Sequence, residues 1–514
     1  MSDIALDGDT LVVRTPHRAT MKQLGASWKE REGAWRLPAT LANAHALSTS
    51  GEDFPDLSAA LMPSWQPVEH PELYDYQRDA VGKLLAVPRG QIVVLSPGLG
   101  KTAVSIVGAD RLVPPGEQVV VVSPAGALMR NWEREIRRWG EVPGDVYIME
   151  GKVDYDRAML ARWIIVSWDK AVRERDLFTP QSKRKWPLWI LDESVLVKSR
   201  RSQRFEKILK LRSGIDRVWL LSGNPTTRHA DDLYTQLRLI WPRAFKSFWR
   251  FAERYCYVEE GPWAKTVTGT RSDRDVMADH ADLITVVNQE DVLDLPEYLF
   301  EVVDVDLTAR QRREYDRMSK TFVAELRGEQ VVTQNEMGKL MKLQQITSWW
   351  ETSAKHDALL DLLPSYEGPH LIWTHWQEGA GELTARLGSA GYRAGWVSGA
   401  TSTAKRDAEI EAFKRGERDA LVLSIGVGKF GHTLTNARTV HYVDKTWNAD
   451  DYFQSLRRVR RIGLTHRPVV VTYRAPGTVD ELVEDNLEGK LGGISKLTRS
   501  RLRELLNGLG REAK

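Results

Sequence analysis

Short apolar runs alternate with helix-like segments twice along this chain of 514 residues. This alternation favours βαβ units, in which a helix crosses over between two parallel strands. The first set of candidate strands comprises Ile92–Leu95, Val119–Val122, Val146–Ile148, Ile164–Val166, Trp189–Leu191 and Val218–Leu221. The second set comprises Leu371–Trp373, Gly395–Val397, Leu421–Leu423, Val440–Val443 and Val469–Thr472. We therefore expect an α/β fold with two parallel-sheet lobes. Between them, residues 246–355 form a connector or insertion with helical segments such as Ala309–Arg327.

The pattern of the first 62 residues predicts a separate small α+β domain. Leu11–Val13 resembles a short strand and Ala19–Leu24 a helix, while Trp28 and Trp35 flank a charged turn. Paired tryptophans of this kind form a local apolar core or a surface that binds nucleic acid. The basic contacts in the second case are Lys22, Lys29, Arg31 and Arg36. We expect the domains to span residues 1–62, 63–298 and 299–489, followed by a basic tail helix at 490–514.

Composition excludes several classes of protein. Cys256 is the single cysteine, which rules out an intrachain disulfide and a zinc site built from a cysteine cluster. No apolar run approaches the roughly 20 residues of a membrane helix, and the N-terminus does not resemble a signal peptide. The net charge is only +3, so a site for a polyanion must come from local clustering. We expect a soluble, cytoplasmic chain.

Gly98-Leu99-Gly100-Lys101-Thr102 follows the first apolar run and precedes a helix-like segment. Glycines allow backbone N–H groups to face a phosphate, Lys101 supplies charge, and the Thr102 hydroxyl can bind a metal ion. The full P-loop pattern has a glycine where Leu95 stands, so this is a reduced form of the motif. The alternative is a glycine turn without a ligand.

Asp192 and Glu193 directly follow the run Trp189–Leu191. The carboxyl ends of parallel strands are where ligands of α/β sheets bind. We expect Asp192 to hold Mg²⁺ and Glu193 to orient or deprotonate the attacking water in a phosphoryl transfer. The alternative is an acidic pair that faces solvent.

Four arginines lie between residues 457 and 461, preceded by the aromatic residues Tyr452 and Phe453. Arg458 and Arg461 are three residues apart, which places them on one face of a predicted helix. Such a pair can stabilise the charge that develops on a γ-phosphoryl group. The alternative is a solvated or phosphate-binding helix.

In order along residues 70–485, these motifs resemble those of Swi/Snf-type superfamily-two DNA-dependent ATPases. Further blocks that agree are Leu73–Gln77, Val122–Pro124, Asn131–Glu135, Ile165–Trp168, Ser222–Pro225, Leu371–Trp376, Val397–Gly399 with Arg406 and Phe413, Ser424–Thr435, Tyr442–Asp444 with Trp447 and Asn448, and Gly477–Glu481. The resemblance implies two RecA-like lobes and an ATP hydrolase that uses Mg²⁺. Its catalytic residues would be Lys101, Asp192, Glu193, Arg458 and Arg461.

The resemblance also implies binding roles. ATP would contact Gln77, which reads adenine in such proteins, together with Gly98, Leu99, Gly100, Lys101, Thr102 and Gly431 of the glycine-rich loop. Polar side chains at strand ends would contact the DNA backbone, namely Ser123, Ser167, Lys198, Thr374 and Ser424. Base-specific readout has no visible source in the sequence.

The sequence departs from the family pattern at several positions. Ser96 and Pro97 precede the phosphate loop in place of the usual acidic pair or similar followed by methionine, and Val195 replaces a histidine after the acidic pair. Lys429 and Thr433 stand where glycine and asparagine are common. Hydrolysis should persist, whereas its coupling to DNA is less secure.

We therefore expect a compact bacterial or phage DNA translocase or helicase-like motor that remodels duplex or branched DNA or its protein complexes. Residues 1–62 faintly resemble the small domain that precedes the ATPase core of annealing helicases. Two alternatives stay open: a superfamily-two ATPase that acts on RNA or serves as a motor subunit, and a non-catalytic ATP-sensing scaffold.

Overall fold

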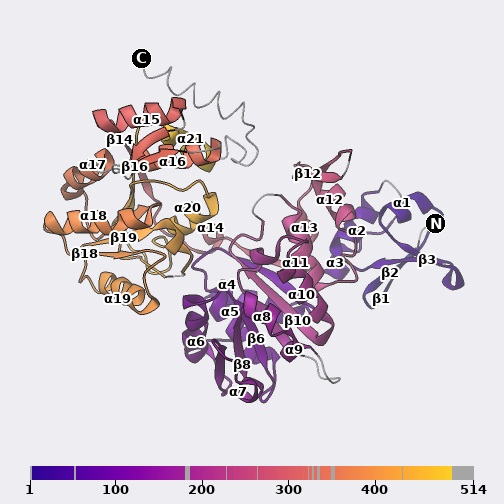
Figure 1. The fold of residues 1–514 in the computed structure, drawn as a ribbon. Helices are drawn as coiled ribbons and strands as arrows, with labels where there is room; N and C mark the ends of the chain where they lie inside the picture. The colour runs from indigo at the N-terminus through magenta and orange to yellow at the C-terminus, as the bar shows by residue number, and fades with distance from the viewer. Residues whose placement is uncertain are drawn as a thin grey trace. The chain divides into compact units, whose positions relative to one another are not determined.

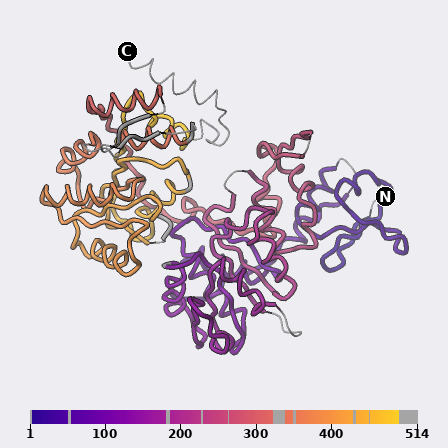
Figure 2. The backbone as a smooth tube through the Cα atoms, in the orientation of Figure 1, coloured from indigo at the N-terminus to yellow at the C-terminus, as the bar shows by residue number. Residues whose placement is uncertain are grey.

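The computed structural model describes residues 3–50, 54–179, 186–226, 229–262, 264–321, 323–326, 329–332, 336–348, 353–430 and 432–488. The chain divides into two compact units, Met1–Val292 and Leu293–Lys514. Figure 1 shows the elements of each unit, and Figure 2 traces the same backbone through the Cα atoms. None of the described helices is long and apolar enough to cross a membrane.

A small antiparallel sheet begins the first unit, with the strand order β1-β2-β4-β3. Its elements are β1 (Asp3–Asp7), β2 (Thr10–Arg14), α1 (Arg18–Gln23), β3 (Ser27–Lys29), β4 (Ala34–Pro38) and α2 (Leu41–Ser48). Trp35 is buried in the core beside Leu11, Val13 and Met21. Trp28 remains 46% exposed and contacts Trp35 edge to face, with ring centroids 5.3 Å apart. The pair therefore supplies both a core residue and a surface aromatic.

The main sheet of the first unit has seven parallel strands in the order β13-β5-β10-β9-β6-β8-β7. All six predicted strands are present, as β5 (Gly90–Leu95), β6 (Val119–Ser123), β7 (Val146–Met149), β8 (Trp163–Ser167), β9 (Trp186–Leu191) and β10 (Ile215–Ser222). The seventh, β13 (Ile284–Val287), pairs with β5 and was not predicted. The strand that carries the phosphate loop therefore lies inside the sheet, flanked on both sides.

Two groups of helices flank this sheet (Figure 1). One group comprises α4 (Asp75–Ala86), α5 (Lys101–Leu112) and α6 (Ala127–Trp139). The other comprises α8 (Trp168–Arg173), α9 (Arg175–Phe178), α10 (Gln203–Leu211) and α11 (Asp232–Ile240). The remaining elements are α3 (Ser58–Leu61), α7 (Tyr155–Leu160), α12 (Phe248–Tyr255), the hairpin β11 (Cys256–Glu260) and β12 (Lys265–Thr270), α13 (Val276–Asp279) and α14 (Gln289–Val292).

The second unit is built on six parallel strands in the order β14-β21-β20-β17-β19-β18. Five were predicted, namely β17 (His370–Thr374), β18 (Ala394–Val397), β19 (Ala420–Ser424), β20 (Thr439–Tyr442) and β21 (Val469–Arg474). The edge strand β14 (Leu299–Asp304) was not. The α/β class, with two parallel-sheet lobes and a small N-terminal α+β sheet, is therefore confirmed.

Separate apolar clusters fill the two faces of this second sheet, one including Leu371 and Phe413 and the other Ile372 and Leu383. The helices are α15 (Ala309–Thr321), α16 (Glu336–Ser348), α17 (Ala354–Leu362), α18 (Gln377–Ser389), α19 (Thr403–Lys414), α20 (Ala449–Leu456) and α21 (Val479–Leu487). The helix predicted over Ala309–Arg327 ends at Thr321, because β15 (Val323–Leu326) turns back to pair with β16 (Glu329–Val332). The predicted tail helix at 490–514 lies outside the described residues.

Candidate functional site

The phosphate loop connects β5 to α5 as predicted, with α5 beginning at Lys101. Gly98 and Gly100 both have positive φ, at 94° and 79°, a region that glycine enters without steric cost. A Cβ on Gly100 would also overlap the amide nitrogen of Gln77. Glycine is therefore required at position 100 by its backbone conformation and by a close neighbour.

Gln77 holds this loop in place. Its side chain is 4% exposed, and its amide Nε2 donates to the carbonyl of Leu99 at 3.0 Å. Its Oε1 accepts from the backbone N–H of Tyr74 at 3.0 Å, and the Tyr76 hydroxyl also donates to the Leu99 carbonyl at 3.2 Å. The start of α4 and the loop are thus one hydrogen-bonded assembly. The predicted contact of Gln77 with adenine stays a prediction.

Lys101 and the unusual Ser96-Pro97 pair complete the loop. The Lys101 ammonium donates to the carbonyl of Leu95 at 3.0 Å. Thr102, the next residue, is half-buried. Ser96 donates its backbone N–H to Val287 at 3.1 Å and accepts the N–H of Gln289 on its hydroxyl at 3.2 Å. This departure from the family pattern therefore fastens the loop to β13 and α14.

Asp192 directly follows β9 at its carboxyl end and is half-buried. Burial raises its pKa to about 6, and the neighbouring Glu193 carboxylate adds to the rise. Three interactions lower the pKa again: the indole N–H of Trp132 donates to Oδ2 at 2.9 Å, Lys101 supplies positive charge, and the backbone N–H of Glu193 donates to Oδ1 at 2.9 Å. Lys101 of the phosphate loop thus acts on the charge of Asp192, which follows a strand in the same sheet.

Glu193 has a φ of 50°, the single positive φ of a non-glycine residue in the described part of the chain. This left-handed conformation costs an L-residue about 1–2 kcal/mol, so the surroundings must enforce it. The next residue is anchored, since the buried Ser194 hydroxyl donates to Gln236 at 2.7 Å. Gln236 in turn donates to the carbonyl of Pro225 at 2.8 Å. The acidic pair is thereby connected to the loop after β10.

Gly223 in that loop approaches the phosphate loop closely. A Cβ at this position would lie 3.1 Å from Pro97 Cγ and 3.6 Å from the Lys101 ammonium nitrogen. Loops after β5, β9 and β10, which are neighbours in the sheet, therefore converge at one edge. Among the described residues, no cluster of three or more His, Cys, Asp or Glu side chains could hold a metal ion alone.

Arg458 and Arg461 are both buried in the second unit, at 8% and 7% exposure. The expectation that they share a helical face is wrong, because α20 ends at Leu456 and the chain continues in tight turns. Arg461 donates to the Arg457 carbonyl at 3.0 Å and to the Thr433 hydroxyl at 2.9 Å. Burial lowers the pKa of Arg461 well below its usual value, and the nearby charge of Arg458 lowers it further. Hydrogen bonds to Arg457 and Thr433 therefore hold the Arg461 guanidinium in place.

The predicted DNA contacts fall into two groups by exposure. Ser167 and Lys198 are half-buried, whereas Ser123, Thr374 and Ser424 are at most 2% exposed. Ser167 caps α8 by accepting the N–H of Lys170, and Thr374 donates to the Asp444 carboxylate at 3.0 Å. Their roles toward DNA stay predictions. The predicted nucleotide contact Gly431 lies outside the described residues.

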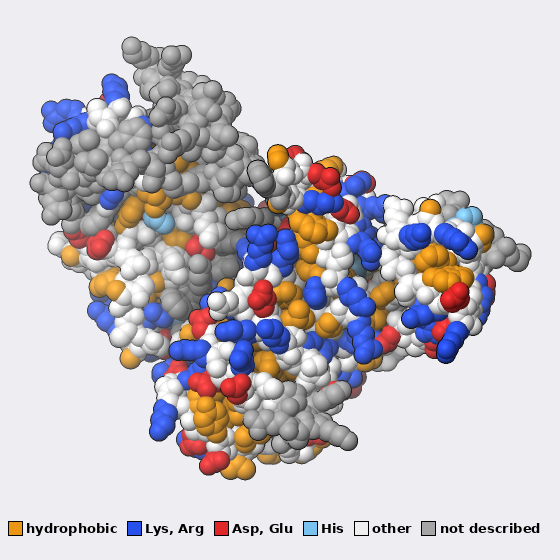
Figure 3. Space-filling view, turned by 45° about the vertical axis from the view of Figure 1, so that its right-hand side comes forward, with side chains coloured by type: hydrophobic (Ala, Val, Ile, Leu, Met, Phe, Trp, Pro, Cys, Tyr) orange, Lys and Arg blue, Asp and Glu red, His pale blue; other side chains and the backbone are white. Residues whose placement is uncertain are grey.

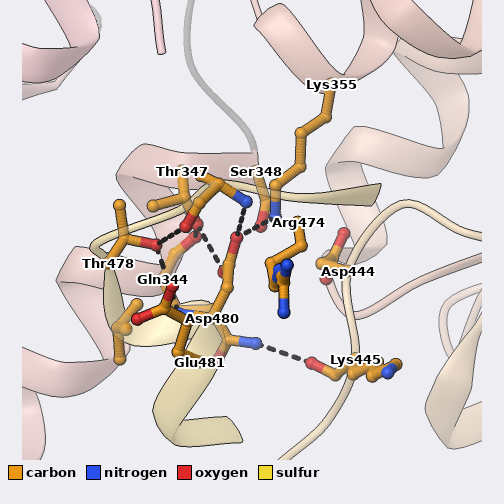
Figure 4. A network of polar contacts seen from close by, with 12 residues as sticks. Gln344, Thr347, Ser348, Lys355, Asp444, Lys445, Arg474, Thr478, Asp480 and Glu481 are labelled. Carbon is orange, nitrogen blue, oxygen red and sulfur yellow. Dashed lines mark hydrogen bonds and ion pairs between the residues drawn. The ribbon is translucent and has the colours of Figure 1, made fainter. Parts of the chain in front are cut away.

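A buried polar network lies in the same unit (Figure 4). The Lys355 ammonium, 1% exposed, pairs with the Asp480 carboxylate at 2.6 Å. Asp480 also accepts from the Thr347 hydroxyl at 3.0 Å and from the Ala475 N–H at 2.9 Å. Burial raises the pKa of Asp444, while the charge of Lys355 lowers it. Lys355 therefore joins α17 electrostatically to α21 and to the end of β20.

Sequence reasoning missed Trp132 and Gln236 as parts of the site. Trp132 belongs to a block that the family resemblance assigns to DNA contact, yet it lies 1% exposed with its indole on Asp192. Its place on the apolar face of an otherwise charged helix was the available signal. Gln236 carried no signal, because its role depends on how α11 packs beside the acidic pair.

The parallel sheet, the glycine-rich phosphate loop and the acidic pair define a nucleotide hydrolase of the P-loop class. The SNF2-related domain family matches residues 65–351, which is more than half of the chain, and the helicase conserved C-terminal domain matches residues 354–463. The chain belongs to the SNF2 family, which confirms the resemblance.

Two curated proteins show the range of its relatives. It is 26% identical to the SWI/SNF-related matrix-associated actin-dependent regulator of chromatin subfamily A-like protein 1 of Xenopus tropicalis, over 82% of this chain and 44% of that protein. It is 22% identical to the human DNA annealing helicase and endonuclease ZRANB3, over 82% of this chain and 40% of that protein. The chain thus spans less than half the length of these two relatives.

A solved structure, the Sulfolobus solfataricus SWI2/SNF2 ATPase core in complex with dsDNA, is similar to this chain with 20% sequence identity and a TM-score of 0.40. The match covers 86% of this chain and 99% of that one.

Proposed function

We propose that this protein is an ATP-driven motor that binds duplex or branched DNA through its backbone and remodels DNA or protein–DNA complexes. The observation that carries the proposal is the convergence of the phosphate loop, Asp192 and Glu193 at one sheet edge in a chain of the SNF2 family. Loops at this edge are where α/β sheets bind their ligands.

Each residue has a role in the proposed hydrolysis. Backbone N–H groups of residues 98–102 and the Lys101 ammonium would bind the phosphates, because this loop opens a helix N-terminus. Glu193 would orient the attacking water. Arg458 and Arg461 would stabilise the charge on the γ-phosphoryl group, an effect worth about 10³–10⁵ in rate for arginines of this kind.

Asp192 and Thr102 suit a bound Mg²⁺. Mg²⁺ prefers hard oxygen ligands and is commonly held by one or two carboxylates together with substrate phosphates, so a single half-buried carboxylate and a hydroxyl fit it. When bound, Mg²⁺ would neutralise charge on the phosphates. The indole of Trp132 and the charge of Lys101 keep Asp192 closer to the ionised form that a cation requires.

The small N-terminal sheet is proposed to contact the DNA, with a preference for branched forms. Trp28, Lys29 and Arg31 are exposed on or next to β3, as the nucleic-acid alternative requires. Arg36 fits less well, because its guanidinium already binds Glu32 at 2.7 Å and Asp7 at 3.0 Å. Loss of fork binding, but not of linear duplex binding, on deletion of residues 1–62 would support this part; equal loss on both would contradict it.

The central test is the ATPase rate without nucleic acid and with single-stranded DNA, duplex, forked DNA and RNA. Stimulation by duplex or fork supports the proposal, stimulation by RNA alone favours an RNA-dependent ATPase, and no phosphate release in any arm favours a scaffold. Lys101→Ala should abolish turnover, whereas Lys152→Ala, which changes an exposed lysine outside the site, should not. ATP hydrolysis that DNA does not stimulate would contradict the proposed motor.

A further inference from the structure

A basic and aromatic surface lies on the first unit at the start of α12, outside the ATP site. We call it the α12 surface, and it is formed by Arg200, Arg201, Lys246, Phe248, Trp249 and Arg250. The Arg200 guanidinium lies 4.3 Å from the centroid of the Phe248 ring and 5.3 Å from that of Trp249. These two rings contact each other edge to face at 4.9 Å. Aromatic packing therefore fixes the guanidinium in place without neutralising it.

The cations of the α12 surface differ from neighbouring cations in their ion pairing. In the described part of the chain, Arg200, Arg201, Lys246 and Arg250 form no ion pair with a carboxylate, and the last three are exposed. By contrast, Arg204 pairs with Asp169 at 2.9 Å, and Lys265 pairs with Glu253 at 2.9 Å. Positive charge is thus concentrated here although the chain as a whole is nearly balanced.

The α12 surface continues onto the small N-terminal sheet. A Cβ on Gly25 would overlap the Arg250 guanidinium, so that group lies directly over the backbone of the turn after α1. The exposed Lys22 precedes this turn, and the exposed Trp28 follows it. Figure 3 shows Lys and Arg side chains on both parts of this unit, with hydrophobic side chains among them.

The two parts are held together by polar contacts across their boundary. Arg254 donates to the Ala42 carbonyl at 2.8 Å, and the His45 ring lies 3.1 Å from the Asp279 carboxylate. The Leu41 N–H at the start of α2 donates to Asp282 at 3.3 Å. These contacts connect α2 to the segment around α12 and α13. The joint surface is therefore one platform rather than two loosely tethered patches.

We infer that this platform is a second DNA contact. It binds the phosphate backbone of a duplex arm that runs from the α12 surface to the small N-terminal sheet. The inference rests on the proposed DNA binding and locates a part of it that the family motifs do not cover. Unpaired arginines and lysines in a row suit phosphates, and the exposed Trp28 can stack on an unpaired base at a junction. Lys198, a predicted DNA contact, lies two residues before Arg200, so the path can continue from one to the other.

The test compares Arg201→Gln/Arg250→Gln with Arg204→Gln in binding assays on forked DNA and on linear duplex, over a series of salt concentrations. The double variant should bind forked DNA about tenfold or more weakly, and the slope of log affinity against log salt should fall by about 1 per cation removed. Arg204→Gln removes a charge at the start of α10 that Asp169 already neutralises, so its affinity and slope should stay close to those of the wild type.

ATP hydrolysis without DNA serves as the measure of folding, because neither variant touches the ATP site. If the wild type binds forked DNA and the double variant binds it with the same affinity and salt slope, the inference is overturned while the proposed function stands. If the wild type binds no DNA, the proposed function itself fails. Weaker binding by Arg204→Gln equal to that of the double variant would also overturn it, since the loss would then reflect net charge alone.

Discussion

At the scale of single residues, the hydrogen bond from Trp132 to Asp192 favours the ionised form of the carboxylate that we propose to hold Mg²⁺. The indole N–H donates to the carboxylate at 2.9 Å and stabilises its ionised form, which burial opposes. Trp132→Phe removes this donor, so the pKa of Asp192, about 6 in the folded protein, should rise. The acidic limb of the pH profile of kcat should then move to higher pH, while kcat on the alkaline plateau changes less.

The matched control is Trp139→Phe on the same helix, whose indole donates to Glu135 at 2.9 Å, away from the acidic pair. Its pH profile should coincide with that of the wild type. Identical pH profiles for all three proteins would show that the protonation of Asp192 does not set the acidic limb of kcat.

The buried pair Lys355–Asp480 allows a second prediction at this scale. Lys355→Met leaves the Asp480 carboxylate buried without its counter-ion, and breaking such a pair costs about 3–5 kcal/mol. Urea unfolding followed by tryptophan fluorescence should show that loss in the transition of the second unit. Adding Asp480→Asn removes the orphaned charge and keeps one acceptor oxygen for the Ala475 N–H, while its amide NH2 can donate to the Thr347 hydroxyl, so it should recover part of the stability. A double variant no more stable than Lys355→Met would contradict the electrostatic explanation.

Residue roles could be predicted only where the chemistry is local in sequence. The phosphate loop and the acidic pair can be found in the sequence because glycines and charged residues directly follow apolar runs there. Trp132 and Gln236 could not be assigned this way, since each acts through a helix that packs against a strand some 40 to 60 residues distant. The role predicted for the arginine pair stays a prediction, and its tight turns were not predicted, because a spacing of three residues also fits a helix.

At the scale of elements, Gly90 at the start of β5 is required by the pairing with β10. Its φ is 108°, and a Cβ there would overlap the carbonyl of Val218, its partner in the parallel register. Gly90→Ala should therefore destabilise the first unit by about 2–4 kcal/mol, combining backbone strain with a clash that rigid sheet backbone cannot relieve. Urea unfolding measures the loss.

Gly116→Ala is the control for the strain alone. Gly116 has a φ of 84°, and a Cβ there meets nothing within 4 Å. Gly116→Ala should lower the free energy of unfolding by about 1 kcal/mol, the cost of a left-handed L-residue without a clash. Equal losses for the two variants would mean that the sheet moves aside at Val218.

Most of the strands that could be predicted, such as β6 and β19, are buried on both faces and form continuous apolar runs. The edge strand β14 escaped prediction since it alternates in exposure, with Phe300 and Val302 more than half exposed. The hairpin β15–β16 escaped because a charged, helix-like pattern runs into it from α15. Edge and insertion elements depend on their neighbours more than on their own pattern.

At the scale of the whole molecule, the near balance of 73 Lys and Arg against 70 Asp and Glu means that DNA affinity must come from localised cations. Each phosphate contact releases counter-ions, so the DNA concentration that half-activates the ATPase should rise steeply with salt, by roughly 10³-fold between about 50 and 200 mM for six or more contacts. Turnover without DNA should change little over this range, because the ATP site lies in a sheet-edge loop and binds its ligand by short-range contacts.

Two duplexes of equal length and different sequence should activate the ATPase equally, as backbone readout predicts. Lys101→Ala, measured by direct binding, should keep the full salt slope while hydrolysing no ATP. Half-activation independent of salt, or a strong preference for one sequence, would contradict backbone binding.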